Sequence, residues 1–376
     1  MLSRACAVGA YQRKLEEIAA HPDIDLTVVV PPEWRDERGV SPLERAYTKG
    51  YALVVEPIAF NGNYHLHFYP KLAHRFAEVK PEVVHIDEEP YNLAAWQALK
   101  LARHQGAKTL FFSWQNLNRR YPFPFSAMEA EVLRRADYAL CGNHGSQTVW
   151  RAKGYKGPVS VFPQFGVDPH LFSPSPERKN AAQGRGSGGG VFTVAFAGRF
   201  VPEKGAHLLI KAATQLDKNV HLTLVGSGPQ KSALEQLAAE SGLKERVIFN
   251  SWIPSTEFPQ FLHSIDALVL PSVGQKNWRE QFGRVLVESM ACGVPVVGST
   301  CGEIPNVIGD AGLVVSENDV PALAEAIRRL RDDDALRAEL SRKGRERALL
   351  HFTHKHIAEA TVRVYREMYT GRQVNR

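Results

Sequence analysis

The sequence predicts an α/β protein built from two Rossmann-like, doubly wound domains. Apolar strand-like runs alternate with amphipathic helical runs in both halves of the chain, as in parallel sheets covered by helices. The segment 173–190 between the halves is rich in Ser, Pro and Gly, so we expect a flexible linker or surface loop there. A length of 376 residues is sufficient for two complete hydrophobic cores.

The first domain is predicted over residues 1–172. Short apolar runs predict buried strands, and the segments between them have the apolar spacing of helices. The predicted strands cover 24–30, 82–86 and 107–113, and the predicted helices cover 11–20 and 91–104.

The beginning of this domain departs from the pattern of a doubly wound fold. Such a domain opens with a buried strand, but only MLSRAC precedes the loop around Gly9 and the helix from Tyr11. We expect a first strand that is cut short by a misplaced start site rather than a strand that the protein lost. A parallel sheet without that strand would expose a long hydrophobic edge.

The second domain is predicted over residues 191–352, and a final helical segment covers 353–376. The alternation of strands and helices is more regular here than in the first half. The predicted strands cover 191–198, 220–226, 246–250, 266–270 and 294–298. The predicted helices cover 205–215, 230–241, 256–264, a segment after Gly283, 319–331, 334–350 and 354–370.

Composition narrows the class of partner. Charged residues at 23% and hydrophobic residues at 44% are typical of a soluble globular protein. The net charge of +6 suits phosphorylated ligands and is compatible with peripheral contact at an anionic membrane surface. No zinc-finger spacing, RNP-like run or long basic block is present, so we do not expect a nucleic acid partner.

The cysteines and the hydropathy pattern bear on location. The four cysteines have no metal-binding spacing, and Cys292 lies in an apolar helical run, so we expect buried, reduced thiols in a cytoplasmic protein. No signal peptide and no apolar run near 18 residues is found, so no membrane span is expected.

Two glutamates bracket the most informative segment, EQFGRVLVE, which runs from Glu280 to Glu288. If the whole segment were helical, the two carboxylates would lie about 12 Å apart along the axis and about 80° apart around it. They could not share one proton or one metal, but they could contact two ends of a long ligand. A helix beginning at Gly283 would offer unpaired N–H groups to a diphosphate between those ends. A nucleotide sugar has this shape.

Two cations follow the strand predicted at 191–198. Arg199 and Lys204 come at its carboxyl end, where doubly wound sheets bind ligands. Such cations could stabilise the charge on a leaving diphosphate without a metal. The alternative is a pair of exposed cations beside Glu203 in a surface turn.

A second glycine-rich turn, GSGP, begins at Gly226. It matches a dinucleotide fingerprint poorly, because Lys231 replaces the third glycine. A tight turn that approaches a nucleotide closely is the better interpretation. Trp252, just after the next strand, could flank the base or belong to the core.

Four segments together resemble the retaining glycosyltransferases of family 4, which have the GT-B fold. They are the Glu280 to Glu288 segment, FAGRFVPEKG from Phe196, LVGSGP from Leu224, and VFPQFGVD from Val161. The resemblance is strong from about Pro158 onward and weaker before it. It implies two Rossmann-like domains facing a central cleft, with the acceptor bound by the first and the nucleotide sugar by the second. It also implies that the helix within 353–376 crosses back onto the first domain, and that no metal or other cofactor is needed.

The resemblance also assigns roles to residues. Glu280 is expected to bind hydroxyls of the transferred sugar, and Glu288 the ribose. Gln281 stands where the family more often has Gly, which affects the sugar contacts. The expected catalytic residues are Arg199, Lys204 and Glu280. The expected donor-binding residues are Gly9, Gly198, Gly226, Gly228, Trp252, Ile253, Phe282, Gly283, Arg284 and Glu288.

The candidate residues for binding the acceptor lie at the C-terminal end of the strand predicted at 82–86. Relatives commonly have His-x-His there, whereas this chain has Asp87 at the second position. A carboxylate could accept the proton of the acceptor hydroxyl, or the acidic run could cap the following helix; both interpretations stay open. The residues concerned are His85, Asp87, Glu88 and Glu89, with Trp114 and Asn116 after the next strand.

The implied activity is a retaining, metal-independent transfer of a sugar from a nucleotide sugar to a hydroxyl of a glycan or lipid-linked acceptor, in cell-surface polysaccharide or glycolipid biosynthesis. A nucleotide-sugar epimerase of the same fold is one alternative, but it needs acids and bases that the chain lacks beyond Asp87 to Glu89. A non-catalytic sugar-binding subunit is another. Incubation with donor alone separates an epimerase from a transferase.

Overall fold

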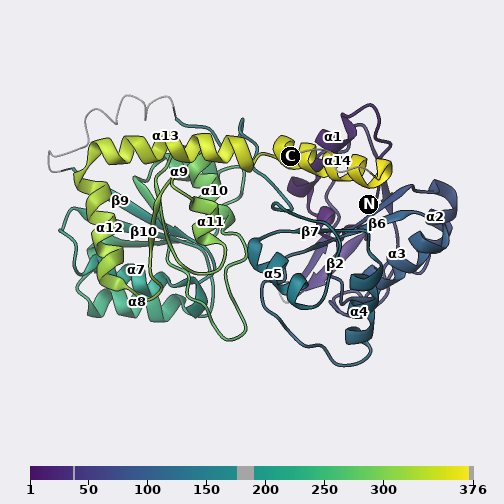
Figure 1. Ribbon diagram of the computed structural model, residues 1–376. Helices are drawn as coiled ribbons and strands as arrows, with labels where there is room; N and C mark the ends of the chain where they lie inside the picture. Colours follow the sequence, from purple (N-terminus) through teal and green to yellow (C-terminus); the bar gives the residue numbers. More distant parts are fainter. Residues whose placement is uncertain (37–38, 176–189, 372–376) are drawn as a thin grey trace. The chain divides into compact units, whose positions relative to one another are not determined.

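The computed structural model describes residues 1–36, 39–175 and 190–371, which form two compact units (Figure 1). The first unit combines Met1–Gly166 with His354–Arg376, and the second is Val167–Thr353. The predicted boundary after residue 172 was therefore too late, because Val167 and Phe172 belong to the core of the second unit. Most of the predicted linker, residues 176–189, lies outside the described residues.

The second unit contains a six-stranded parallel sheet in the order β11-β10-β9-β12-β13-β14. The strand order runs outward in both directions from the β9–β12 neighbours, which is the topological switch point where ligands bind in such sheets. The strands are β9 (Phe192–Ala197), β10 (Val220–Val225), β11 (Val247–Asn250), β12 (Ala267–Leu270), β13 (Val296–Ser299) and β14 (Leu313–Val315).

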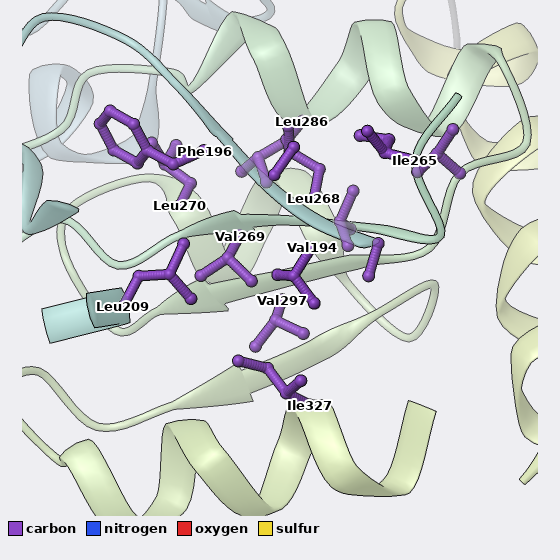
Figure 2. Packing of buried hydrophobic residues seen from close by; sticks show 14 of the residues in the cluster. Val194, Phe196, Leu209, Ile265, Leu268, Val269, Leu270, Leu286, Val297 and Ile327 are labelled. Atoms are coloured by element: carbon purple, nitrogen blue, oxygen red, sulfur yellow. The ribbon is translucent and has the colours of Figure 1, made fainter. Parts of the chain in front are cut away.

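Helices cover both faces of this sheet. Figure 2 shows Leu286 of α10 and Ile327 of α12 on opposite sides of the strands that carry Val194, Val269 and Val297. Such runs are apolar throughout because both faces of a parallel sheet are buried. The helices are α7 (Ala206–Ala213), α8 (Lys231–Glu240), α9 (Phe258–His263), α10 (Arg284–Ala291), α11 (Ile304–Ile308), α12 (Val320–Asp332) and α13 (Asp334–His351).

The first unit has two groups of parallel strands. One is the four-stranded sheet β5 (Val83–Ile86), β6 (Lys108–Ser113), β7 (Tyr138–Cys141) and β8 (Val159–Val161), and the other pairs β1 (Thr27–Val30) with β4 (Ala52–Val55). Leu2 lies between them and forms parallel bridges to Val29 and to Ile86. The Leu2 N–H donates to the His85 carbonyl at 2.9 Å, and the Ser3 N–H donates to the Val29 carbonyl at 3.0 Å. The first three residues thus stand in the position of a first strand.

The helices of this unit are α1 (Arg13–Ala19), α2 (Leu72–Val79), α3 (Leu93–His104), α4 (Phe125–Arg135), α5 (His144–Ala152) and α14 (His354–Thr370). A hairpin of β2 (Glu33–Asp36) and β3 (Gly39–Pro42) was not predicted. Helix α14 packs on α1, and its Tyr365 hydroxyl is hydrogen-bonded to His85 Nδ1 at 2.7 Å. The predicted strands and helices are all present, with ends that differ by at most three residues. None of the helices in the described ranges is both long and apolar enough to cross a membrane.

Candidate active site

Lys204 and Glu280 meet beside the switch point of the second unit. Lys204 ends a 3-10 turn that follows β9, and Glu280 lies in the segment between β12 and α10. The Lys204 ammonium lies 2.6 Å from Glu280 Oε2, and the Ser272 hydroxyl donates to the same oxygen at 3.0 Å. Only 6% of Glu280 is exposed. A buried carboxylate with two donors keeps a fixed position at the carboxyl end of the sheet.

The loop that carries Glu280 is itself held in place. Trp278 lies with its ring centroid 5.2 Å from the Lys204 ammonium and forms an antiparallel bridge with Gln275. The Gly274 N–H donates to a Glu317 carboxylate oxygen at 2.6 Å. These contacts come from residues that the sequence did not single out, because only the tertiary fold brings Trp278 onto the lysine.

Helix α10 begins at Arg284, after Gly283 in the left-handed region at φ 77°. Glu280 therefore lies outside the helix, and the separation calculated for a continuous helix does not apply. Glu288 is buried, and Arg284 donates to it through Nε at 2.7 Å. Burial raises the pKa of the Glu288 carboxyl, and the neighbouring Arg284 opposes that effect. A buried carboxylate requires a hydrogen-bond or ion-pair partner, and Arg284 is that partner for Glu288.

The glycines of the β9 and β10 turns permit a close backbone approach. Gly226 has φ 147°, and a Cβ there would lie 1.9 Å from the Gly198 carbonyl oxygen. Gly228 has φ 153°, and its Cβ would lie 2.5 Å from the Phe200 carbonyl oxygen. No L side chain fits either position. The tight turn that the sequence predicts here is present, and its approach to a nucleotide stays a prediction.

The other donor-side candidates have different environments. The Arg199 side chain is 57% exposed and lies 3.8 Å from the Glu203 carboxylate. Trp252 is 70% exposed, so its interpretation as a core residue is wrong. Ile253 is partly buried against the core, and Phe282 packs edge-on against Phe352 at 5.7 Å between centroids.

The candidate residues at the C-terminal end of β5 in the first unit are largely buried. His85 is 2% exposed, and burial lowers its pKa well below the ordinary value. Asp87 is 5% exposed and accepts hydrogen bonds from the Ser3 hydroxyl at 2.5 Å and from Gln164 Nε2 at 2.6 Å. Burial raises the Asp87 pKa, and these donors oppose the effect together with Lys14. Both side chains are thus buried, and their role on the acceptor side stays a prediction.

Glu88 is also enclosed, but in a cationic environment. It lies 3.6 Å from Arg4 and 3.4 Å from His67, and it accepts from Asn92 Nδ2 at 3.1 Å. Burial raises its pKa, but Arg4 and His67 outweigh burial and bring it down to about 2. Asn92, not the acidic run, caps helix α3 by accepting from the Ala95 N–H at 2.8 Å. The cap interpretation of the acidic run is wrong.

The remaining candidates lie on the loops of the first unit. Glu89 is partly exposed and accepts from the Ser113 hydroxyl at 2.6 Å and the Trp114 N–H at 2.8 Å. Trp114 donates through Nε1 to Gln164 at 2.9 Å, and Asn116 is partly buried beside Gly145. The Gly9 N–H donates to Glu44 at 2.6 Å, so a carboxylate already occupies that donor.

Comparison with known proteins relates the second half of the chain to a family. Residues 177–347 match the family model of the glycosyl transferases group 1. The lipopolysaccharide core biosynthesis glycosyltransferase LpsD of Rhizobium meliloti (strain 1021) is 41% identical over 173 residues, which are 45% of this chain and 48% of that protein. The GDP-mannose-dependent alpha-(1-6)-phosphatidylinositol monomannoside mannosyltransferase of Mycolicibacterium smegmatis is 34% identical over 191 residues, 49% of this chain and 50% of that protein. The chain thus spans about half the length of the curated relatives it matches.

The fold comparison extends over nearly the whole chain. The crystal structure of Anabaena HepE in complex with UDP-glucose matches with a TM-score of 0.68 at 19% identity, over 97% of this chain and 98% of that one. The two Rossmann-like units are those of a GT-B protein. Residues 177–347 are thus similar to the glycosyl transferases group 1 family.

Proposed function

We propose that this protein is a retaining, metal-independent glycosyltransferase that moves a sugar from a nucleoside diphosphate donor to an acceptor hydroxyl. The observation that supports this most is the Lys204–Glu280 pair at the carboxyl edge of the second sheet. A fixed cation and a fixed carboxylate at one point match the two neighbouring needs of a nucleotide sugar, a diphosphate and a hydroxyl-bearing ring.

Lys204 can bind the diphosphate of the donor while it stays paired with Glu280. The Lys204 ammonium has three N–H donors, so it can bind Glu280 and still donate to a phosphate oxygen. Arg199, which is largely exposed two residues after β9, can bind the same diphosphate in a bidentate way. The N-terminal end of helix α10 adds the positive end of the helix dipole without a metal.

In the proposed reaction, the bond between the anomeric carbon and the diphosphate oxygen breaks, and a bond to the acceptor oxygen forms on the same face. The proton of the acceptor hydroxyl passes to the leaving diphosphate oxygen. Lys204 and Arg199 stabilise the charge that develops on the diphosphate, and Glu280 holds hydroxyls of the transferred sugar as its ring gains positive charge. Glu288 and Arg284 bind the ribose end.

Two relatives guide the choice of substrates. One is named for lipopolysaccharide core biosynthesis and the other for a GDP-mannose-dependent step on a phosphatidylinositol monomannoside. We propose an acceptor in cell-surface polysaccharide or glycolipid biosynthesis, with UDP- and GDP-hexoses as the first donors to test.

The test begins with a thermal-shift screen of nucleotide sugars, because a specific donor raises the melting temperature by mass action. Donors that bind are then assayed for nucleoside diphosphate release with and without acceptor. Release that requires an acceptor supports a transferase, and conversion of donor alone into an isomer would establish the epimerase alternative. Activity should persist in EDTA; complete loss that Mn²⁺ or Mg²⁺ restores would refute the metal-independent mechanism.

A further inference from the structure

Glu89 differs from its two acidic neighbours in what surrounds it. Asp87 is buried and has both oxygens in hydrogen bonds, and Glu88 is buried between Arg4 and His67. Glu89 is the member of the three that keeps partial exposure. The Ser113 hydroxyl and the Trp114 N–H fix its carboxylate from the side of β6. Each carboxylate oxygen can accept a further hydrogen bond, so Glu89 can bind a ligand hydroxyl without losing these two.

An aromatic group, which we call the tyrosine cluster, adjoins this carboxylate. It consists of Tyr91, Tyr121, His65 and Phe125, all partly exposed. The rings of Tyr91 and Tyr121 stack at 4.3 Å between centroids, and His65 lies 5.4 Å from Tyr91. Hydrogen bonds link this group to Glu89: the Tyr121 hydroxyl donates to Gln115 Oε1 at 3.1 Å, and the Gln115 N–H donates at 3.0 Å to the Ser113 hydroxyl that binds Glu89.

The tyrosine cluster and Glu89 lie where a doubly wound sheet binds ligands. Glu89 and Tyr91 follow the carboxyl end of β5, and Tyr121 follows that of β6. Ligand sites combine apolar, aromatic walls with a few fixed polar groups that orient the ligand. A pyranose ring matches this combination, because it has an apolar C–H face and hydroxyl groups at its rim.

The Glu89 carboxyl suits a ligand hydroxyl. Burial raises the pKa of this carboxyl to about 7, so near neutral pH it can both donate and accept a hydrogen bond. Lys153, which lies 5.2 Å from the centroid of the Tyr121 ring, is already bound to Glu129 at 2.5 Å.

We propose that Glu89 and the tyrosine cluster form the acceptor subsite, and that they bind a pyranose ring with one hydroxyl hydrogen-bonded to the Glu89 carboxyl group. Glu89 orients the acceptor and takes no proton in this assignment. The inference rests on the proposed transferase function, but the subsite lies within the first unit and can be tested without a donor.

The binding test uses the methyl α-D-pyranosides of mannose, glucose and galactose as probes, observed by saturation-transfer-difference NMR with the full chain. At least one probe should show saturation transfer to its ring protons with wild type. The signal should fall at least tenfold in Tyr91→Ala and in Glu89→Gln. It should persist in Tyr91→Phe, which keeps the ring, and in Glu82→Gln, which alters an exposed carboxylate elsewhere.

The kinetic test measures acceptor KM and donor hydrolysis in the same variants. Glu89→Gln and Tyr91→Ala should raise the acceptor KM at least tenfold, while donor hydrolysis without acceptor and melting temperature stay close to wild type. An unchanged acceptor KM, no probe binding to wild type, or an equal loss of donor hydrolysis would overturn the subsite. If wild type never turns over a donor but binds the probes through Glu89, the proposed function fails and the sugar subsite stands.

Discussion

At the residue scale, Lys204 and Glu280 are coupled in a way that their 76-residue separation conceals. From the sequence we expect Lys204 to bind the diphosphate and Glu280 to bind the transferred sugar. The 2.6 Å contact means that each also sets the position of the other. Removing Lys204 takes a charged partner from a buried carboxylate, which is more costly than the loss of an exposed pair.

We predict non-additive effects in Lys204→Ala, Glu280→Gln and the double variant. Each single change should lower turnover by roughly 100-fold, and the double variant should be little worse than the poorer single one, because both disrupt one electrostatic unit. Turnover and circular dichroism should be measured for all three. The matched control is Lys231→Ala, which removes an exposed lysine paired within α8. Effects that multiply fully would show that the two residues act independently.

Glu280 and Glu288 should give different kinetic signatures. Glu288→Gln should mainly raise the donor KM, because ribose contacts are equal in the ground and transition states. Glu280→Gln should mainly lower kcat, because contacts at the reacting sugar strengthen in the transition state. Both constants are measured at saturating acceptor, and two indistinguishable profiles would contradict the division of roles.

Glu88 should contribute acid-sensitive stability to the first unit. Its pKa is lowered to about 2 in the folded protein, so its contribution is complete above the ordinary glutamate range and is lost as pH falls toward 2. The melting-temperature deficit of Glu88→Gln should therefore be largest near pH 7 and shrink steadily below about pH 4.5, near the ordinary glutamate pKa. A deficit that stays constant from pH 7 to pH 3 would mean that packing, not charge, explains the role of Glu88.

At the element scale, the turn after β10 depends on backbone-to-backbone proximity. Gly226 donates its N–H to the Asn250 carbonyl at 3.0 Å and lies directly against the Gly198 carbonyl. A side chain at this position would separate β9 from β10 at the edge where the donor is proposed to bind.

Gly226→Ala should cost well over 2 kcal/mol and abolish donor binding, because the added Cβ meets a carbonyl oxygen in addition to backbone strain. Gly242→Ala is the matched control, since Gly242 also has positive φ, at 69°, but has open space around it. The control should cost only about 1 kcal/mol. Urea denaturation and donor thermal shift measure both effects, and equal losses in the two variants would contradict the clash.

Regular elements were predictable where apolar periodicity is local. Strand β12, ALVL, is entirely buried and reads directly as a core strand. The β2–β3 hairpin was not predictable from WRDERGV, because its strands are mostly exposed and lack an apolar repeat. Trp278 was missed for a related reason: its contact with Lys204 arises only after two distant loops meet.

At the scale of the whole molecule, the first unit is built from two segments that are far apart in the sequence. Helix α14 belongs to the first unit although it follows the second in sequence, and its Tyr365 bonds to His85, 280 residues away. No local pattern encodes that contact, so only the family resemblance led to the expectation. The sequence also gave no sign that His85, a candidate on the acceptor side, is buried and hydrogen-bonded to a residue of α14.

Tyr365→Phe should test the attachment of α14 to its unit. It removes the hydroxyl partner of a buried histidine whose Nε2 already lacks one, so it should cost about 1–3 kcal/mol. Arg366 lies on the same helix as Tyr365, and Arg366→Ala breaks an exposed ion pair with Asp23, so it should have a much smaller effect. Denaturant unfolding of both variants gives the comparison, and an equal or larger loss in Arg366→Ala would contradict the anchoring role of Tyr365.

The most direct measurement is NMR of the products formed by wild type and Lys204→Ala from a nucleotide sugar that raises the melting temperature. The proposed transferase should release nucleoside diphosphate only together with a new glycoside, whose anomeric configuration matches that of the donor. Lys204→Ala should lose this product by roughly 100-fold or more while keeping its fold. A product of inverted configuration, isomerised donor without diphosphate release, or full activity in Lys204→Ala would contradict the proposed mechanism.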